Sequence, residues 1–246
     1  MIPFKSKFAG AVLAGAVMLL SMLSSQASWA QQTDISQYDI YNGFTYFETP
    51  WLNLAERGYH LQVGRNMNRW LAIGFDYSVV SGHNSLTPNE LQPDVQEELG
   101  LLIEELIREG VIPPDYQLIV PTDAFSQTFA LGPQLEYRHF KKVTLFARPS
   151  IGVIRQRVTP HPTDPVSTLV VQQLLPSGSK VDWQSFWGFG GGYDWYATHH
   201  FGLRMQADLV YWTLFSDLLK NGTWTVRFSV GPTFRFGKNI LDIKSH

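Results

Sequence analysis

Residues 224–236 read WTVRFSVGPTFRF and alternate strictly between two kinds of side chain. The apolar set is Val226, Phe228, Val230, Pro232, Phe234 and Phe236. The polar or small set is Thr225, Arg227, Ser229, Gly231, Thr233 and Arg235. A period of two residues predicts a β-strand. Because one face is unbroken and aromatic while the other carries arginines among small residues, the pattern is typical of a strand between lipid and a narrow polar interior. A soluble barrel would reverse the two faces.

Seven further segments have strand character, and the connections between them alternate in length. The eight predicted strands are residues 38–47, 58–66, 70–79, 127–137, 143–155, 183–195, 201–211 and 224–236. Three short turns alternate with longer loops, which is the asymmetry of outer-membrane barrels. A β-sandwich gives no reason for this alternation. In lipid only helices and closed barrels satisfy every backbone group. The sequence therefore predicts an all-β fold, an eight-stranded antiparallel up-and-down transmembrane β-barrel.

Aromatic residues gather at both ends of the predicted strands. At the short-turn ends lie Trp70, Tyr137, Trp195, Phe201, Phe234 and Phe236. At the long-loop ends lie Trp51, Tyr59, Tyr77, Trp183, Tyr211 and Trp224. Two belts of this kind are typical of the two membrane interfaces, where an amphipathic ring sits at the level of the headgroups. Aromatic residues also cap strands in soluble proteins, but together with the inverted alternation they favour a membrane.

The first thirty residues have the features of an export signal. Lys5 and Lys7 precede an apolar run over residues 8–23, and the segment ends in Ala-Ser-Trp-Ala at positions 27–30. Small residues at the third-last and last positions predict cleavage by signal peptidase, so we expect residues 1–30 to be removed and residues 31–246 to form one barrel domain. The alternative is a single membrane anchor. The sequence has no cysteine for a disulfide or a lipid anchor.

Charge and composition narrow the class of partner. Without the two signal lysines the chain has 17 basic and 21 acidic residues, a net charge of −4. This balance offers no electrostatic basis for binding nucleic acid. We expect instead that the protein is exported to the cell outer membrane, where it contacts outer-membrane lipids and lipopolysaccharide. We expect it to be a monomer.

Eight charged residues fall on the inward faces of the predicted strands. The predicted charge network of the lumen consists of Asp76, Glu136, Arg148, Asp194, Arg204, Asp208, Arg227 and Arg235. In a barrel too narrow for bulk water, such charges must pair or cost several kcal/mol each. The set is open to two interpretations, a charged conduction path or a salt-bridged plug, and we predict the plug.

The long connection over residues 81–125 contains a predicted amphipathic helix at about 94–109. Thr87-Pro-Asn-Glu90 has the pattern of a capping box with proline at the first helical position, and Gly110 with Pro113-Pro114 ends the helical spacing. The apolar face consists of Val95, Leu99, Leu102, Ile103, Leu106 and Ile107. The polar face carries Asp94, Glu97, Glu98, Glu104, Glu105 and Glu109. We expect such an acidic face to bind anionic lipopolysaccharide only through bridging divalent cations.

A second apolar loop segment offers that helix a surface to pack on. Residues 168–175 read TLVVQQLL and are flanked by Pro165 and Pro176. We predict that the two segments pack together as a cap over the barrel mouth. The alternative is that the helix binds a partner or meets the lipid surface.

Catalytic and metal sites have little support in the sequence, so we expect no enzyme and no cofactor or metal. His139, His199 and His200 fall at the short turns, and His60, His83 and His161 fall towards the outside. None has the serine and carboxylate spacing of a hydrolase, and the His199-His200 pair lacks further metal ligands. An enzyme that modifies lipid A, or a narrow pore, remains the alternative function.

The chain resembles the small outer-membrane β-barrel family, the class of the outer-membrane protein A transmembrane domain. The resemblance rests on residues 41–46 (YNGFTY), the glycine and aromatic alternation of 186–195, and the closing 228–236 (FSVGPTFRF). It implies insertion by the outer-membrane assembly machinery, whose recognition signal is a terminal aromatic residue. Ten residues follow Phe236 here. Because function in such barrels lies in the loops, we expect a structural or extracellular-interaction role.

Overall fold

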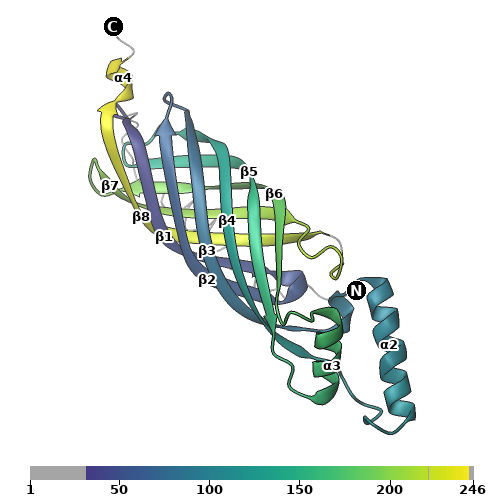
Figure 1. Cartoon of the computed structure of the whole chain (residues 1–246). Coiled ribbons are helices and arrows are strands. Elements are labelled where there is room, and N and C mark those ends of the chain that lie inside the picture. The colour runs from purple at the N-terminus through teal and green to yellow at the C-terminus, as the bar shows by residue number, and fades with distance from the viewer. Residues whose placement is uncertain (1–31, 221, 244–246) are drawn as a thin grey trace.

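The computed structural model describes residues 32–220 and 222–243, and these residues form a closed ring of antiparallel strands (Figure 1). The strands are β1 (Ser36–Thr49), β2 (Leu54–Asn66), β3 (Leu71–Leu86), β4 (Val120–Tyr137), β5 (Val143–Pro160), β6 (Lys180–Tyr196), β7 (Phe201–Trp212) and β8 (Thr223–Asn239). Each strand pairs with its neighbours in sequence, and β8 pairs with β1 to close the ring. The predicted eight-stranded up-and-down barrel is confirmed. The predicted signal peptide lies outside the described residues.

Strand ends at the short turns agree with the prediction within three residues, but four strands extend further at the long-loop end. β3 continues to Leu86 and β4 begins at Val120, seven residues beyond the predicted bounds in each case. The prediction stopped where the apolar alternation stops. Pairing nevertheless continues between polar residues, as in His83 opposite Asp123. These extensions project a sheet beyond the membrane level.

The wall has the inverted polarity that the alternation predicts. Large apolar side chains on the outer face are exposed, among them Phe75, Leu131, Ile151, Trp187 and Phe234. The inward positions are polar and almost completely buried, such as Gln62 and Thr144. Among the described residues, no helix is both long and apolar enough to cross a bilayer. An apolar outer wall around a polar interior is the architecture of a transmembrane barrel.

In the part of the chain that the structure describes, helices occur only outside the ring. The 3₁₀ turns η1 (Pro50–Leu52) and η2 (Pro88–Glu90) and the helices α2 (Pro93–Arg108) and α3 (Pro165–Leu174) lie at the long-loop end. Helix α4 (Ile240–Ile243) follows β8 at the opposite end (Figure 1). The predicted helix at about 94–109 is therefore present. The predicted capping box forms at Thr87 and Glu90, where the Glu90 carboxylate accepts a hydrogen bond of 2.8 Å from the Thr87 backbone N–H, but it caps η2 and not α2.

The two helices at the long-loop end pack against each other, as predicted. Leu99 of α2 and Val170 of α3 are buried in one apolar cluster with Leu118 and Val120. The cluster is completed by the partly buried side chains of Leu91, Val95, Leu102, Ile103, Tyr116, Val171 and Leu174. Four of the six apolar-face residues of α2, Val95, Leu99, Leu102 and Ile103, thus pack against other parts of the chain.

The barrel mouth is closed by a different group of residues, which corrects the predicted position of the cap. A buried apolar layer fills the lumen at the long-loop end. Its members are Leu52, Leu54, Ala124, Ala130, Ile154, Phe186, Val210, Trp212, Leu214, Phe215 and Leu219. Leu214, Phe215 and Leu219 belong to the connection between β7 and β8, which the Asp182 carboxylate holds by accepting a hydrogen bond of 2.6 Å from the Phe215 N–H. This connection and η1 close the mouth.

The ladder between β4 and β5 is interrupted at one place. Leu131 pairs with Ile151 and Leu135 pairs with Ala147, but the three positions between them do not pair. In this register Pro133 lies opposite Pro149. Neither proline has an N–H to donate, so neither strand can complete its ladder there.

Candidate functional site

The structure places all eight predicted lumen charges inside the barrel. Each has a relative exposure of 7% or less. They come from six strands, β3 to β8, and form two groups at different heights in the lumen. Most of these charges are balanced within the barrel, as the contacts below show.

Asp76 of β3 is the centre of the group nearer the mouth. Arg148 donates from Nη1 to Asp76 Oδ1 at 2.7 Å, and its Nη2 forms an ion pair with Oδ2 at 2.5 Å. Arg227 lies 3.7 Å from Asp76 Oδ2 and donates through Nε to Asp208 Oδ2 at 2.6 Å. Two arginines and two aspartates therefore balance each other in a space without bulk water, which offsets the large cost of burying each charge.

The second group lies nearer the short turns and is centred on Asp194 of β6. Arg204 donates to both of its oxygens, from Nε at 2.6 Å and from Nη2 at 2.8 Å. The Tyr196 hydroxyl donates to the same carboxylate at 2.8 Å. Asp39 Oδ1 lies 3.6 Å from Arg204 Nη2 and adds a second negative charge. The planar guanidinium matches the carboxylate in the bidentate geometry that strengthens such pairs.

Glu136 and Arg235 depart from the expected pairing. Glu136 forms an ion pair with Arg138, which belongs to the turn after β4. Arg235 donates to Thr144 Oγ1 at 3.1 Å and to Gln32 Oε1 at 3.3 Å, and its guanidinium lies over the Tyr196 ring. No carboxylate of the described residues lies within ion-pair distance of Arg235. Arg235 therefore pairs with none of the four predicted acids. Neutral oxygens and an aromatic ring replace the expected partner.

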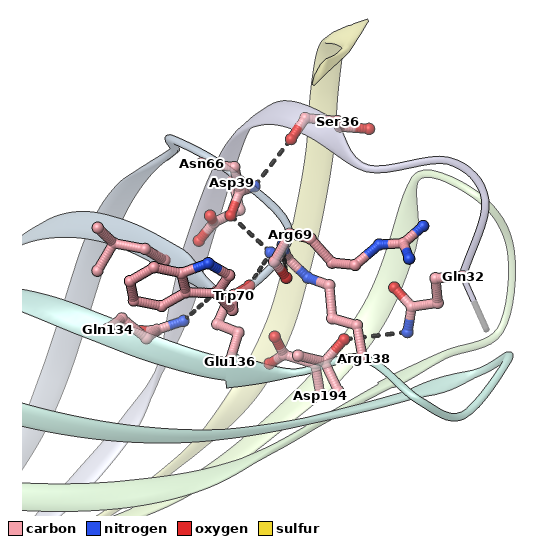
Figure 2. Close-up of polar contacts among 12 residues, drawn as sticks. Gln32, Ser36, Asp39, Asn66, Arg69, Trp70, Gln134, Glu136, Arg138 and Asp194 are labelled. Atoms are coloured by element: carbon pink, nitrogen blue, oxygen red, sulfur yellow. Dashed lines mark hydrogen bonds and ion pairs between the residues drawn. The ribbon is translucent and has the colours of Figure 1, made fainter. Parts of the chain in front are cut away.

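Side-chain amides connect Arg204 to the short-turn end of the lumen. Gln62 accepts from Arg204 Nη1 at 2.8 Å and donates to Gln134 Oε1 at 2.9 Å. Gln134 in turn donates to Glu136 at 2.7 Å. Figure 2 shows the continuation, in which Arg138 contacts Glu136 and donates to Asn66 Oδ1 at 2.6 Å. The result is a continuous polar network that fills the lower lumen, the part of the interior between the apolar layer and the short turns.

Four buried ionisable residues were not among the predicted set: Asp39, Glu56, His60 and Arg138. Asp39 lies on the first strand, which like the second alternates less regularly than the later strands. Arg138 was assigned to a turn, although its side chain reaches back into the lumen. Glu56 precedes the predicted start of the second strand. His60 was expected towards the outside, but it is completely buried in the lumen.

His60 connects a serine and an aspartate, contrary to the expectation for the histidines. Its Nδ1 lies 3.1 Å from Ser229 Oγ and its Nε2 lies 3.4 Å from Asp76 Oδ1. All three residues are at most 4% exposed, and Asp76 already binds Arg148. A substrate cannot reach an enclosed row of this kind, so it has a structural role. Within residues 32–220 and 222–243, no group of three or more His, Cys, Asp or Glu residues has the arrangement of a metal site.

Gly190 makes room for part of the network. A Cβ atom at this position would collide with the Asp208 carboxylate. Gly188, Gly190 and Gly192 alternate along the inward face of β6. At Gly190 the space is used by an aspartate of β7, which is thereby held against Arg227.

Comparison with known proteins supports the fold. No family model matches the chain, and no curated protein matches its sequence. The crystal structure of neisserial surface protein A is similar, with a TM-score of 0.52 and 10% sequence identity over 82% of this chain and 98% of that chain. OprG of Pseudomonas aeruginosa has a TM-score of 0.47 at 10% identity, covering 85% of this chain and 99% of its own. Ail, the attachment invasion locus protein of Yersinia pestis, has a TM-score of 0.41 at 15% identity, covering 82% and 97%.

Proposed function

Because this chain has the fold of the small eight-stranded outer-membrane β-barrels, we propose that it is an integral outer-membrane protein whose interior is closed and whose loops carry a structural or extracellular-interaction role. Residues 1–30 direct its export, and the assembly machinery of the outer membrane inserts it as a monomer. The observation that carries the proposal is the double closure of the lumen.

The closure has two layers of different chemistry. The charge network occupies the lower lumen, where Arg148, Arg204 and Arg227 each bind a carboxylate. The apolar layer lies above it and contains the buried rings of Phe186 and Trp212. An ion would have to displace paired charges and then cross apolar side chains, which is costly on both counts. This arrangement argues against the narrow pore.

The surface beyond the membrane is dominated by the connection between β3 and β4. This connection holds α2, whose exposed face carries Asp94, Glu97, Glu98, Glu104 and Glu105. Residues 81–125 together hold nine acidic residues and one basic residue. A rigid, strongly acidic projection suits an extracellular-interaction role better than a lipid-binding role, because the phosphates of the outer leaflet are also negative.

The lipid-modifying enzyme is the weaker alternative. Its strongest support is the row of Ser229, His60 and Asp76, and this row is enclosed on all sides. A catalytic serine on such a barrel must be open to the lipid or to the outer surface.

Conductance of the purified protein tests the closed interior. After reconstitution in planar bilayers we expect little steady current at any voltage that the bilayer tolerates. Robust ohmic channels would contradict the proposal. Gel mobility provides the control for folding, because a folded barrel resists SDS until it is boiled and then changes its mobility. Both measurements use the mature chain.

A further inference from the structure

The lipid-facing wall over β3 to β6 has an apolar groove of about 600 Å³. The groove is lined by Phe75, Phe129, Ala130, Leu131, Ile151, Gly152, Val153, Ser185, Phe186 and Trp187. Most of these side chains belong to the outer face, which contacts the hydrocarbon of the membrane. The groove is therefore positioned to hold an acyl chain.

One small outward residue accounts for the depth of this groove. Ser185 of β6 points outward between Trp183 and Trp187, and it lies opposite Val153 of β5. Gly152 lies on the inward face of β5, since a Cβ atom there would collide with the Phe186 ring of the apolar layer, and its backbone lines the groove. Large rings on both sides of this serine leave a furrow in a wall that is otherwise covered by large side chains.

Two arginines without acidic partners lie directly above the groove. Arg155 and Arg157 follow Val153 on the outward positions of β5, so they are about 7 Å and 13 Å further along the strand. Arg155 donates to Gln127 at 3.2 Å and its guanidinium lies 5.7 Å from the centre of the Trp183 ring. Among the described residues Arg157 has no hydrogen-bond or ion-pair partner. Both guanidinium groups therefore retain donors for a ligand.

A second, smaller hollow of about 180 Å³ borders Arg157. It is lined by Ser81, Gly82, His83, Asp123, Ala124, Phe125, Arg157 and Thr159. Asp123 is the one carboxylate in this lining. It lies 2.5 Å from His83 Nδ1 and 3.0 Å from His161 Nε2, so both of its oxygens are already engaged. Hydroxyl groups and a guanidinium are left to face the hollow.

The height of the arginines matches the level of lipid headgroups. Phe129 contacts Tyr77 at a centroid distance of 5.0 Å, and Tyr77 belongs to the aromatic belt at the long-loop end. Arg155 and Arg157 are the first charged outward residues of β5 beyond the position paired with Phe129. Basic residues just beyond an aromatic belt meet the phosphates of the leaflet. Guanidinium groups bind phosphate in the bidentate geometry that lysine lacks.

We propose that this wall binds one phosphorylated glycolipid of the outer leaflet, with a headgroup phosphate on Arg155 and Arg157 and an acyl chain in the groove below. The proposal rests on the outer-membrane location proposed above and adds the binding site and the chemistry of the lipid. The acidic helix α2 takes no part. The lipid instead contacts the wall of the barrel, where the outward basic residues are.

Lipid retention in nanodiscs tests the proposal. The mature barrel is reconstituted in phosphatidylcholine nanodiscs that contain a small fraction of diphosphoryl lipid A or its dephosphorylated derivative. Native mass spectrometry then counts the lipid that remains bound. We expect the wild-type protein to retain diphosphoryl lipid A about tenfold more strongly than the dephosphorylated lipid, since the two guanidinium–phosphate contacts are lost with the phosphates.

Matched variants separate the two parts of the site. R155Q/R157Q removes both charges and is expected to lower the retention of diphosphoryl lipid A about tenfold. R108Q makes the same chemical change on α2 and is expected to have no effect. Ser185→Phe fills the groove and is expected to weaken retention of both lipids, because an acyl chain no longer fits.

Three outcomes would overturn the proposal. The first is equal retention of the two lipids by the wild-type protein, and the second is equal retention of diphosphoryl lipid A by R155Q/R157Q and R108Q. The third is displacement of the lipid by millimolar inorganic phosphate, because the arginines would then bind a soluble anion. The mobility shift on boiling is recorded for every sample. A wild-type chain that fails to insert and shows no shift would contradict the proposed outer-membrane function, whereas an inserted barrel without lipid selectivity contradicts this inference alone.

Discussion

Asp194 and Arg204 lie directly opposite each other on β6 and β7 and join through two parallel hydrogen bonds of 2.6 Å and 2.8 Å. Both side chains are only 1% exposed. The contact is therefore a cross-strand pair and a buried salt bridge at the same time. It fixes the register of β6 and β7 by electrostatics, in addition to the backbone ladder.

Removal of one partner of this pair should destabilise the barrel strongly. Arg204→Met leaves Asp194 buried without its main counter-charge, and we expect a loss of about 3–5 kcal/mol in the free energy of unfolding. Urea unfolding in detergent measures the loss. Arg108→Met is the control, because the Arg108 pair with Glu105 is long and exposed and contributes little. Equal stability of the two variants would contradict a structural role for the network.

The apolar layer at the mouth should contribute to stability independently of the charges. Trp212 is 4% exposed and donates from Nε1 to Thr225 Oγ1 at 2.8 Å. We expect Trp212→Ala to cost about 3–5 kcal/mol, as is usual for a buried tryptophan. Trp51→Ala is the control, since Trp51 is 52% exposed. Because the charge network remains in place, Trp212→Ala should still conduct little in planar bilayers, and large currents from it would show that the lower layer does not close the lumen.

The contact between α2 and α3 should be separable from the barrel. Leu99→Asp places a charge in the cluster that joins the helices, whereas Leu101→Asp changes an exposed leucine of the same helix. We expect Leu99→Asp to accelerate proteolysis within residues 89–113, while the boiling-dependent mobility shift of the barrel stays the same. Because other residues close the mouth, deletion of residues 89–113 should also leave that shift intact. A lost shift would show that the helices are part of the cap.

Acid should loosen α3 through its N-terminal cap. Asp164 accepts hydrogen bonds from the Val166 and Ser167 N–H groups at 2.9 Å and 3.0 Å and from the Tyr116 hydroxyl at 2.9 Å. Burial acts to raise the pKa of Asp164, but these hydrogen bonds outweigh it and lower the pKa below the ordinary value of 3.8. Burial and the neighbouring Asp164 raise the pKa of Tyr116 to about 12, so this hydroxyl keeps its proton.

Because the pKa of Asp164 is lower in the folded state, its ionised carboxylate stabilises the cap at pH values above the pKa of the unfolded state. This contribution is lost as the pH falls through the pKa of the folded state. We therefore expect hydrogen-exchange protection of residues 165–174 to be constant above about pH 5 and to fall below about pH 4. Asp164→Asn keeps a capping side chain and should remove this pH dependence. Unchanged protection of the wild-type helix at low pH would contradict the role of Asp164.

The barrel and its inward charges could be predicted from sequence because both depend on a local rule. In a strand, neighbouring side chains alternate between lipid and lumen, so the inward position of Arg227 follows from its place between Val226 and Phe228. The same rule assigned Asp76 and Asp208. It is also why the short-turn ends were accurate, since the apolar alternation there continues to the turn.

The positions of the residues that were not predicted depend on contacts between segments that are distant in the sequence. Arg138 lies in a turn, and only the folded chain shows that it reaches Glu136. Phe186 and Trp212 point inward, against the polar-inside rule, because the connection between β7 and β8 brings Phe215 onto them. His60 contacts Ser229 of β8 and Asp76 of β3. The two-residue alternation within one strand gives no information about contacts between distant strands.

The apolar layer at the mouth also has a consequence for the cell. Each barrel inserted in an outer membrane is a potential leak for small hydrophilic solutes. Here the route through the molecule is blocked first by dry side chains such as Leu214 and Trp212, before any solute meets the charged interior. With the interior closed as proposed, many copies could occupy the membrane without lowering its resistance to toxic compounds.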